Sequence, residues 1–178
     1  NLKRIKVKES NISLVYIEKV SESSHRQMML EREASTDELT GLANRRGFQR
    51  TMESNQDDPL SLAIIDIDQF KSVNDRFGHL AGDDTLTSIA EHLQNAFQDR
   101  AIVLSRMGGD EFSVLFKSND SASIIRWLDE FRNSVAASFV DAGKKISVTV
   151  SIGAALSNAA VHSSRQLLTE ADKCLYQA

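Results

Sequence analysis

The feature that most constrains the fold is an apolar run, LSLAIID, over residues 60–66. A strand with one face in water alternates apolar and polar residues, whereas nearly every residue of this run is apolar. Both faces of the strand are therefore expected to be covered, which places it near the centre of a sheet. Its C-terminal end carries a carboxylate, Asp66.

A second strong signal is a two-glycine turn at residues 108–109, between apolar residues at 101–104 and 112–116. Glycine adopts backbone angles with φ > 0 and lets a ligand approach closely. Alternating β-branched and aromatic residues on either side are typical of strands. The pattern predicts a hairpin that displays Asp110 and Glu111 at its tip.

Helical and strand patterns alternate along the rest of the chain. Helices are expected over residues 46–55, 83–97 and 122–139 and from Ser163 onward, and a further strand over residues 145–155. With the hairpin antiparallel in the same sheet as the central strand, the order predicts an α+β fold. The expected type is ferredoxin-like or polymerase-palm-like, with a central sheet flanked by helices and a linker helix before it.

The N-terminal segment has a different character. Residues 5–19 hold two short strand-like runs, a hairpin pattern too small to fold alone. Residues 1–20 are therefore expected to be the C-terminal end of an upstream domain, and they resemble the end of a PAS-type sensor. A linker helix is expected over residues 21–36. Its apolar repeat is too short to indicate a coiled coil, so a solvent-exposed connecting helix is favoured.

Composition excludes several classes of protein. With 178 residues and 41% hydrophobic residues, the chain can form one domain plus a short extension. The net charge of −4 provides no basic surface for nucleic acid or an anionic membrane. No apolar stretch is long enough to span a bilayer and no signal-like segment is seen, so a cytoplasmic location is expected, in a parent protein that could still be membrane-attached. The single cysteine, Cys174, is expected to be a partly buried residue of a helix.

Four acids are candidates for a metal site. Asp66 and Asp68 follow the central strand, and Asp110 and Glu111 follow the turn. Two carboxylates about 4 Å apart repel by roughly 4 kcal/mol at an effective dielectric constant near 20, which a cation or a proton relieves. Oxygen ligands without His or Cys favour Mg²⁺ or Mn²⁺. For Asp68, a role in ending the strand is an equally good interpretation.

A polar segment at residues 70–83 offers groups that can read a base. Asn74 can donate and accept, and the carboxylate of Asp83 can accept from two adjacent N–H groups, the pattern of guanine. Lys71 is placed to meet phosphate charge. Asp83 also fits a helix N-cap, which can coexist with base reading, and His79 is expected to hold the loop by a structural hydrogen bond.

Four blocks of the sequence match, in order, the signature of the GGDEF domain, the catalytic domain of diguanylate cyclases. They are DELTGLANRRGF (37–48), DIDQFKSVNDRFGHLAGDDTL (66–86), RMGGDEF (106–112) and VSIGAA (150–155). Seven of the eight glycines fall inside these blocks, and the similarity extends over residues 37–178. The chain thus resembles this family over all but its N-terminal segment.

The resemblance implies that two GTP molecules are condensed to cyclic di-GMP and pyrophosphate, with each GTP held by one subunit of a homodimer. By position, Asp66, the carbonyl of Ile67 and Asp110 hold two Mg²⁺ or Mn²⁺ ions per active site, and Glu111 assists as a ligand or base. A sensor upstream is the implied regulator, because it can set the geometry between two catalytic domains.

The rest of the implied site binds the nucleotide. Asn74 and Asp83 bind guanine, and the backbone amides around Phe70 and Lys71 meet the phosphates. Gly108 and Gly109 let the nucleotide lie against the turn. The alternative is a catalytically silent GGDEF domain that acts as a GTP-binding or dimerisation module, although silent members usually have a damaged signature.

Two departures from the family pattern matter. Members with product feedback carry Arg-x-x-Asp before the signature, where this chain has Asp99 and Ile102. The usual inhibitory site is therefore expected to be absent. The last helix, ending at Ala178, resembles one that the family continues with a Lys and a Gly-Arg-Asn that contact the triphosphate, so weaker GTP binding is expected with the tail cut short there.

Overall fold

The structure is a computed structural model that describes residues 2–6, 13–17, 26, 29–31, 33–138, 148–157 and 163–178. The chain divides into two compact units, Asn1–Ala34 and Ser35–Ala178. In the first unit, β1 (Leu2–Lys6) pairs antiparallel with β2 (Ser13–Ile17). The predicted hairpin is confirmed, although β1 begins before the expected segment, and its assignment to a PAS-like domain stays a prediction.

The predicted linker helix over residues 21–36 lies largely outside the described residues. Residues 26, 29–31 and 33 are helical. Thr36, at the predicted end of the helix, instead pairs with Ala43 in an isolated β-bridge. The helix therefore ends before residue 36, and this bridge lies at the start of the second unit.

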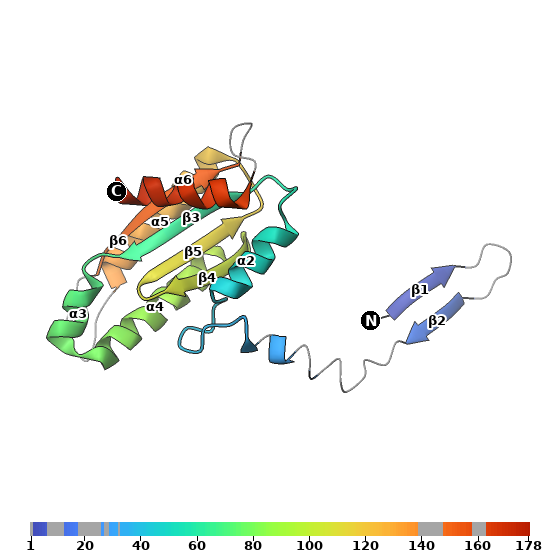
Figure 1. Ribbon diagram of the computed structural model, residues 1–178, viewed down its shortest axis with the longest axis horizontal. Helices are drawn as coiled ribbons and strands as arrows, with labels where there is room; N and C mark the ends of the chain where they lie inside the picture. Colours follow the sequence, from blue (N-terminus) through green and yellow to red (C-terminus); the bar gives the residue numbers. More distant parts are fainter. Residues whose placement is uncertain are drawn as a thin grey trace. The chain divides into compact units, whose positions relative to one another are not determined.

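Four antiparallel strands form the sheet of the second unit, in the order β4-β5-β3-β6 (Figure 1). They are β3 (Ser61–Ile67), β4 (Ala101–Gly108), β5 (Glu111–Phe116) and β6 (Val150–Leu156). β3 lies between β5 and β6, and all of its residues except Asp66 are buried. The predicted central strand is confirmed with a shift of one residue. The strand expected over 145–155 begins at Val150, and residues 145–147 lie outside the described part.

Helices cover both faces of this sheet, as the α+β prediction required (Figure 1). α2 (Arg45–Ser54) and α6 (Ser164–Tyr176) pack on one face, and α4 (His79–Phe97) and α5 (Ser121–Ser138) on the other. Successive residues of β3 alternate between the two cores. Leu62 and Ile64 contact the core under α2 and α6, whereas Ala63 and Ile65 belong to the core under α4 and α5. This double packing explains why the strand is apolar throughout.

The segment expected to be a loop before residue 83 is helical. α3 (Phe70–Phe77) ends at Gly78, with φ of 88°, and α4 follows at once from His79. Asp83 therefore lies inside α4 and does not cap it, because Gly78 holds the N-cap position. Glycines and polar residues lower helix propensity here, but tertiary packing outweighs it. A Cβ atom on Gly82 would overlap the side-chain oxygen of Asn74, so this glycine lets α3 and α4 pack closely.

The final helix begins where the sequence predicted. Ser163 caps α6 in a capping box with Gln166. A Cβ atom on Gly153 of β6 would collide with the backbone of α6, so the glycine lets this helix lie directly on the strand. Cys174 is in α6 but exposed, so its predicted partial burial is wrong; the inward stripe runs through Leu167 and Ala171. None of the helices in the described residues is long and apolar enough to cross a membrane.

Candidate functional site

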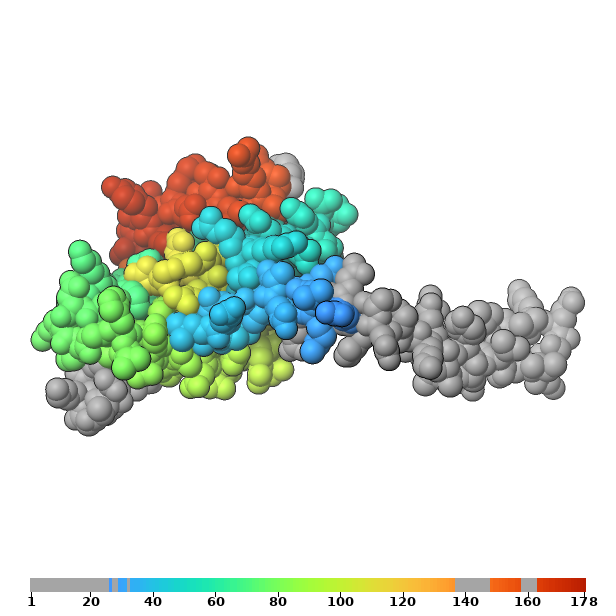
Figure 2. Space-filling view, turned by 60° about the horizontal axis from the view of Figure 1, so that its bottom comes forward, coloured from blue at the N-terminus to red at the C-terminus, as the bar shows by residue number. Residues whose placement is uncertain are grey.

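The turn between β4 and β5 leaves space for a ligand. Gly108 has φ of 143° and Gly109 has φ of 57°, both in the region that favours glycine. A Cβ atom on either residue would meet no heavy atom within 4 Å among the described residues. Figure 2 shows the surface around this turn, in yellow, between the green surface of α3 and α4 and the red surface of α6. The predicted open hairpin tip is present.

Arg106 holds this turn in place. Its Nε and Nη2 atoms donate to the carbonyl oxygen of Gly109 at 2.9 and 2.8 Å. Its Nη1 atom donates to both carboxylate oxygens of Asp37, at 3.2 and 3.4 Å. Burial tends to raise the pKa of Asp37, but hydrogen bonds from Thr40 and the charge of Arg106 outweigh it and lower the pKa below its usual value. The guanidinium of Arg106 therefore links Asp37, near the start of the second unit, to the turn between β4 and β5.

Three carboxylates lie near the end of the sheet beside this turn and interact electrostatically. Asp66 and Glu111 are direct partners in the register of β3 and β5, and Asp110 precedes Glu111 in the turn. The pKa of Asp66 is raised to about 6, first by burial and then by the negative charges of Asp110, Glu111 and Asp68. The structure therefore brings together the acids that the sequence placed on separate strands.

The donor set at this end of the sheet fits a divalent cation. Unpaired carboxylates raise each other's pKa, and a cation relieves that repulsion. Asp66, Asp110 and the carbonyl of Ile67 are hard oxygen donors, which suit Mg²⁺ or Mn²⁺. Within the described residues, no three His, Cys, Asp or Glu side chains are gathered into a ready-made metal site. The set thus fits an ion that also takes ligands from a bound phosphate.

The carboxylate of Asp68 is held by two hydroxyl groups, one of them on Ser151, the register partner of Asp66. Its oxygens accept hydrogen bonds from Thr149 Oγ1 at 2.5 Å and from Ser151 Oγ at 2.7 Å. β3 ends at Ile67, so the alternation that would align Asp68 with Asp66 does not reach it. Of the two interpretations of Asp68, the structure supports the one in which it serves the fold, and only its charge reaches Asp66.

The start of α3 offers backbone donors for phosphate. Phe70 and Lys71 are its first two residues, and the N–H groups of a first helical turn lack partners inside the helix. Such groups are a favourable site for anions. Lys71 is exposed and forms no ion pair within the described part of the chain. Both residues therefore have the groups that the sequence assigned to phosphate binding.

The two predicted guanine ligands lie on neighbouring helices. Asn74 is on α3 and Asp83 on α4, and the two helices pack against each other. Neither side chain forms a hydrogen bond or ion pair among the residues described, so their polar atoms remain available to a base. His79 is exposed at the start of α4 and makes no hydrogen bond there, so the predicted structural hydrogen bond is not found.

Some residues of the site were missed by sequence reasoning. Arg106 and Asp37 lie inside the matched blocks but had no assigned role. A cavity of about 230 Å³ beside Glu111 is also lined by Arg45 and by Asp172 of α6. The position of Arg106 just before the two glycines could have suggested that it holds the turn. Nothing in the spacing of the sequence identified Asp37 as its partner.

The chain is similar to known proteins over this whole region. The family described as "Diguanylate cyclase, GGDEF domain" matches residues 34–178. Diguanylate cyclase A of Treponema denticola is 37% identical over 120 residues, which cover 67% of this chain and 32% of that protein. Cyclic di-GMP phosphodiesterase PdeB of Shewanella oneidensis is 29% identical over 163 residues, covering 90% of this chain and 19% of that protein.

A solved structure agrees with these matches. The coiled coil and GGDEF domain of DgcB from Caulobacter crescentus, in complex with c-di-GMP, superposes with a TM-score of 0.77 at 28% identity. The superposition covers 85% of this chain and 84% of that one. The chain spans about a third or less of the length of the two curated relatives. Residues 34–178 match the family along their full length, and the chain therefore belongs to the diguanylate cyclase GGDEF domain family.

Proposed function

We propose that the chain condenses two GTP molecules into cyclic di-GMP with release of pyrophosphate. The observation that carries this proposal is the carboxylate cluster of Asp66, Asp110 and Glu111 at an open glycine turn. Burial, and then the negative charges of Asp110, Glu111 and Asp68, raise the pKa of Asp66 to about 6, and perturbed carboxylates of this kind are concentrated at functional sites. The residues assigned to guanine, Asn74 and Asp83, and the amides of Phe70 and Lys71 assigned to phosphate are also present.

In each half-reaction, the 3′-hydroxyl oxygen of one GTP forms a bond to the α-phosphorus of the other, and the bond to pyrophosphate breaks. Asp66, the carbonyl of Ile67 and Asp110 would hold two Mg²⁺ or Mn²⁺ ions. When bound, these ions lower the pKa of the hydroxyl and neutralise charge on the pyrophosphate. Glu111 assists as a ligand or as the base that takes the hydroxyl proton.

The remaining residues bind and orient the nucleotide. Asn74 and Asp83 hydrogen-bond the edge of guanine, and the amides of Phe70 and Lys71 hold the phosphates. Gly108 and Gly109 let the nucleotide lie against the turn without a side-chain clash. Holding both reactants in line supplies much of the rate enhancement in reactions of this class.

Each GTP provides a hydroxyl to the other, so two active sites must face one another in a homodimer. The geometry between the two domains is then a natural point of control for an upstream sensor. The inhibitory Arg-x-x-Asp motif is replaced by Asp99 and Ile102, and Ile102 packs against the core under α2 and α6. We propose that the chain lacks this product brake.

The second candidate function is a GTP-binding module without catalysis. The observation in its favour is the similarity to PdeB, a relative named as a phosphodiesterase. The intact carboxylate cluster favours the cyclase, because a module that only binds GTP has no need of repelling acids.

The test is to incubate the purified dimer with GTP and Mg²⁺ and to measure cyclic di-GMP and pyrophosphate by mass spectrometry. Asp110→Asn should keep the fold and lower turnover by about a thousandfold or more, because it removes a metal ligand. Asp58→Asn is the matched control, since Asp58 pairs with Lys117 away from the turn, and it should keep full turnover. GTP binding without product in the wild-type dimer would favour the silent module instead.

Guanine recognition is tested separately. Asp83→Ser removes the carboxylate that accepts from guanine and should reduce the preference for GTP over ATP by about tenfold or more. Asp84→Ser, on the adjacent exposed position of α4, is the control. Unchanged discrimination in Asp83→Ser would refute the role of Asp83.

A further inference from the structure

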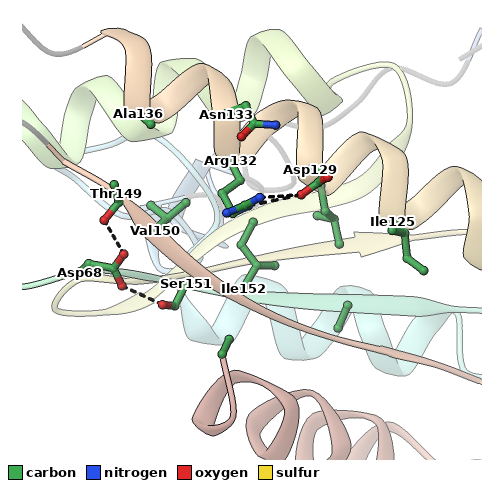
Figure 3. A pocket seen from close by; sticks show the side chains of 13 residues that line it. Asp68, Ile125, Asp129, Arg132, Asn133, Ala136, Thr149, Val150, Ser151 and Ile152 are labelled. Atoms are coloured by element: carbon green, nitrogen blue, oxygen red, sulfur yellow. Dashed lines mark hydrogen bonds and ion pairs between the residues drawn. The ribbon is translucent and has the colours of Figure 1, made fainter.

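Asp68 is held by three hydrogen bonds to one segment of chain. Its carboxylate accepts from Thr149 Oγ1 at 2.5 Å and from Ser151 Oγ at 2.7 Å, and its N–H donates to the carbonyl of Thr149 at 2.9 Å. Figure 3 shows the carboxylate between the two hydroxyl side chains. These bonds join the first residue after β3 to the beginning of β6, and we name the three residues the hydroxyl clamp.

The clamp is maintained by hydrogen bonds more than by packing. Its three members form one end of a cavity of about 620 Å³ between α5 and β6, whose other wall includes Ile125 and Arg132 (Figure 3). Because open space lies beside them, a smaller or apolar side chain at Thr149 or Ser151 meets no steric obstacle. Loss of a hydroxyl should therefore act through the clamp itself.

The residue after the clamp has an unusual backbone. Gln69 has φ of 54° and ψ of 31°, and no other non-glycine residue in the described ranges has a positive φ. Its side chain is exposed and makes no capping hydrogen bond. A residue of this kind persists in a left-handed conformation only when its surroundings hold it there. After Gln69 in the chain, the amide of Ser72 donates to the Gln69 carbonyl at 2.7 Å. Before it, Asp68 is fixed by the hydroxyl clamp.

The left-handed turn decides where α3 begins. It lies between Ile67, the last residue of β3, and Phe70, the first of α3. The direction of the free amides of Phe70 and Lys71 relative to Asp66 thus depends on this single residue. Functional sites are where such strained conformations are concentrated.

We propose that Asp68 is a positioning residue of the active site. Through Thr149 and Ser151 it holds the left-handed turn at Gln69, and the turn aims the amides of Phe70 and Lys71 at the GTP phosphates. This inference rests on the proposed function of the same site. In this role Asp68 acts through the backbone, without contact to nucleotide or metal, and its hydroxyl partners at the start of β6 are as important as its own charge.

The clamp is tested with Asp68→Ala, with Thr149→Val/Ser151→Ala and with the triple variant. Each should weaken GTP binding about tenfold, the scale of hydrogen bonds to a charged group, and the triple variant should lose no more than either parent. Affinity for guanosine should fall much less than affinity for GTP, because Asp83 lies on α4, beyond the disturbed turn. Thr169→Val on exposed α6 is the control for removing a hydroxyl.

Gln69 provides a test of the backbone itself, because its exposed side chain has no packing to lose. Gln69→Asn should keep GTP affinity, since Asn tolerates the left-handed region, whereas Gln69→Val should weaken it as Asp68→Ala does. Hydrogen exchange of the amides at 70–72 should rise in Gln69→Val and in the clamp variants. A general loss of structure would instead lower guanosine affinity in parallel and would overturn the proposal.

Direct metal binding by Asp68 gives a different outcome. In that case Thr149→Val/Ser151→Ala would keep normal GTP affinity and only Asp68→Ala would lose it, which would also overturn the proposal. The affinity and exchange measurements need no turnover. Absence of cyclic di-GMP from the wild-type protein would therefore defeat the proposed function and leave the positioning role of Asp68 intact.

Discussion

Two partly buried aspartates beside the signature turn have opposite surroundings. Asp66 faces other acids, and its pKa is raised to about 6. Asp37 accepts hydrogen bonds from Thr40 and Arg106, and its pKa is lowered. Asp37 is neutralised by a cation and accepts hydrogen bonds, whereas Asp66 has only negative charges beside it. Burial and the neighbouring acids raise the pKa of Asp66, whereas the hydrogen bonds from Thr40 and the charge of Arg106 outweigh burial at Asp37.

The largest effect is expected from Asp66→Asn. Turnover should fall by about a thousandfold or more, because the proposed metal ligand is lost. The metal-free variant should nevertheless be more stable than wild type at pH 7.5 by about 1 kcal/mol, a value reduced from the full pKa shift for solvent screening. Thermal unfolding in EDTA measures this difference. A variant less stable than wild type would show that the cluster does not carry the repulsion described.

The second prediction concerns Arg106→Ala, which removes the contacts that hold the turn between β4 and β5. Asp37 then loses its cation and the Gly109 carbonyl loses two donors, so the variant should lose about 1–2 kcal/mol of unfolding free energy. Turnover should fall about tenfold because the turn that presents Asp110 is no longer held. Arg106→Lys keeps the charge but lacks the planar fork, and it should recover stability more than turnover. Urea unfolding and steady-state kinetics separate the two.

The third prediction concerns how the Mg²⁺ concentration needed for activity depends on pH. In the proposed role Asp66 holds a cation only when ionised, so the Mg²⁺ concentration for half-maximal activity should rise as pH falls through about 6. The stability effect has the opposite sign. Between its usual value of 3.8 and about 6, Asp66 keeps its proton only in the folded state, so metal-free stability falls as pH rises through this window. A Mg²⁺ requirement independent of pH from 5 to 7, measured by titration at each pH, would contradict the assignment.

The smallest effect concerns Asp37. Its folded pKa lies below 3.8, so its stabilisation is complete above pH 3.8 and is lost as pH falls through the folded pKa. Asp37→Asn should lower stability at pH 7 by about 1 kcal/mol and flatten the acid side of the stability curve. Asp129→Asn is the control, because its pair with Arg132 is exposed at the surface. Urea unfolding from pH 2.5 to 7 provides the measurement.

Sequence reasoning succeeded where the information is local. The doubly apolar strand, the glycine hairpin and the Ser163 cap each depend on residues that are close in the chain, and each is present. It was wrong about the segment before Asp83, where a loop was expected and a helix only from residue 83, because α3 and the start of α4 occupy it. Two helices form there because Gly82 makes room for Asn74, a contact that helix propensity does not contain.

By itself, the sequence determined the central strand, the hairpin that carries Asp110 and Glu111, and membership of the family. Only the tertiary structure decided that Asp37, 69 residues away, neutralises Arg106, and that Asp68, 81 and 83 residues from its partners, turns to Thr149 and Ser151. The physical reason is range. Backbone propensity and apolar periodicity act between residues that are close in the chain. A carboxylate instead accepts hydrogen bonds from any donor that the fold places within about 3 Å, however distant it is in sequence.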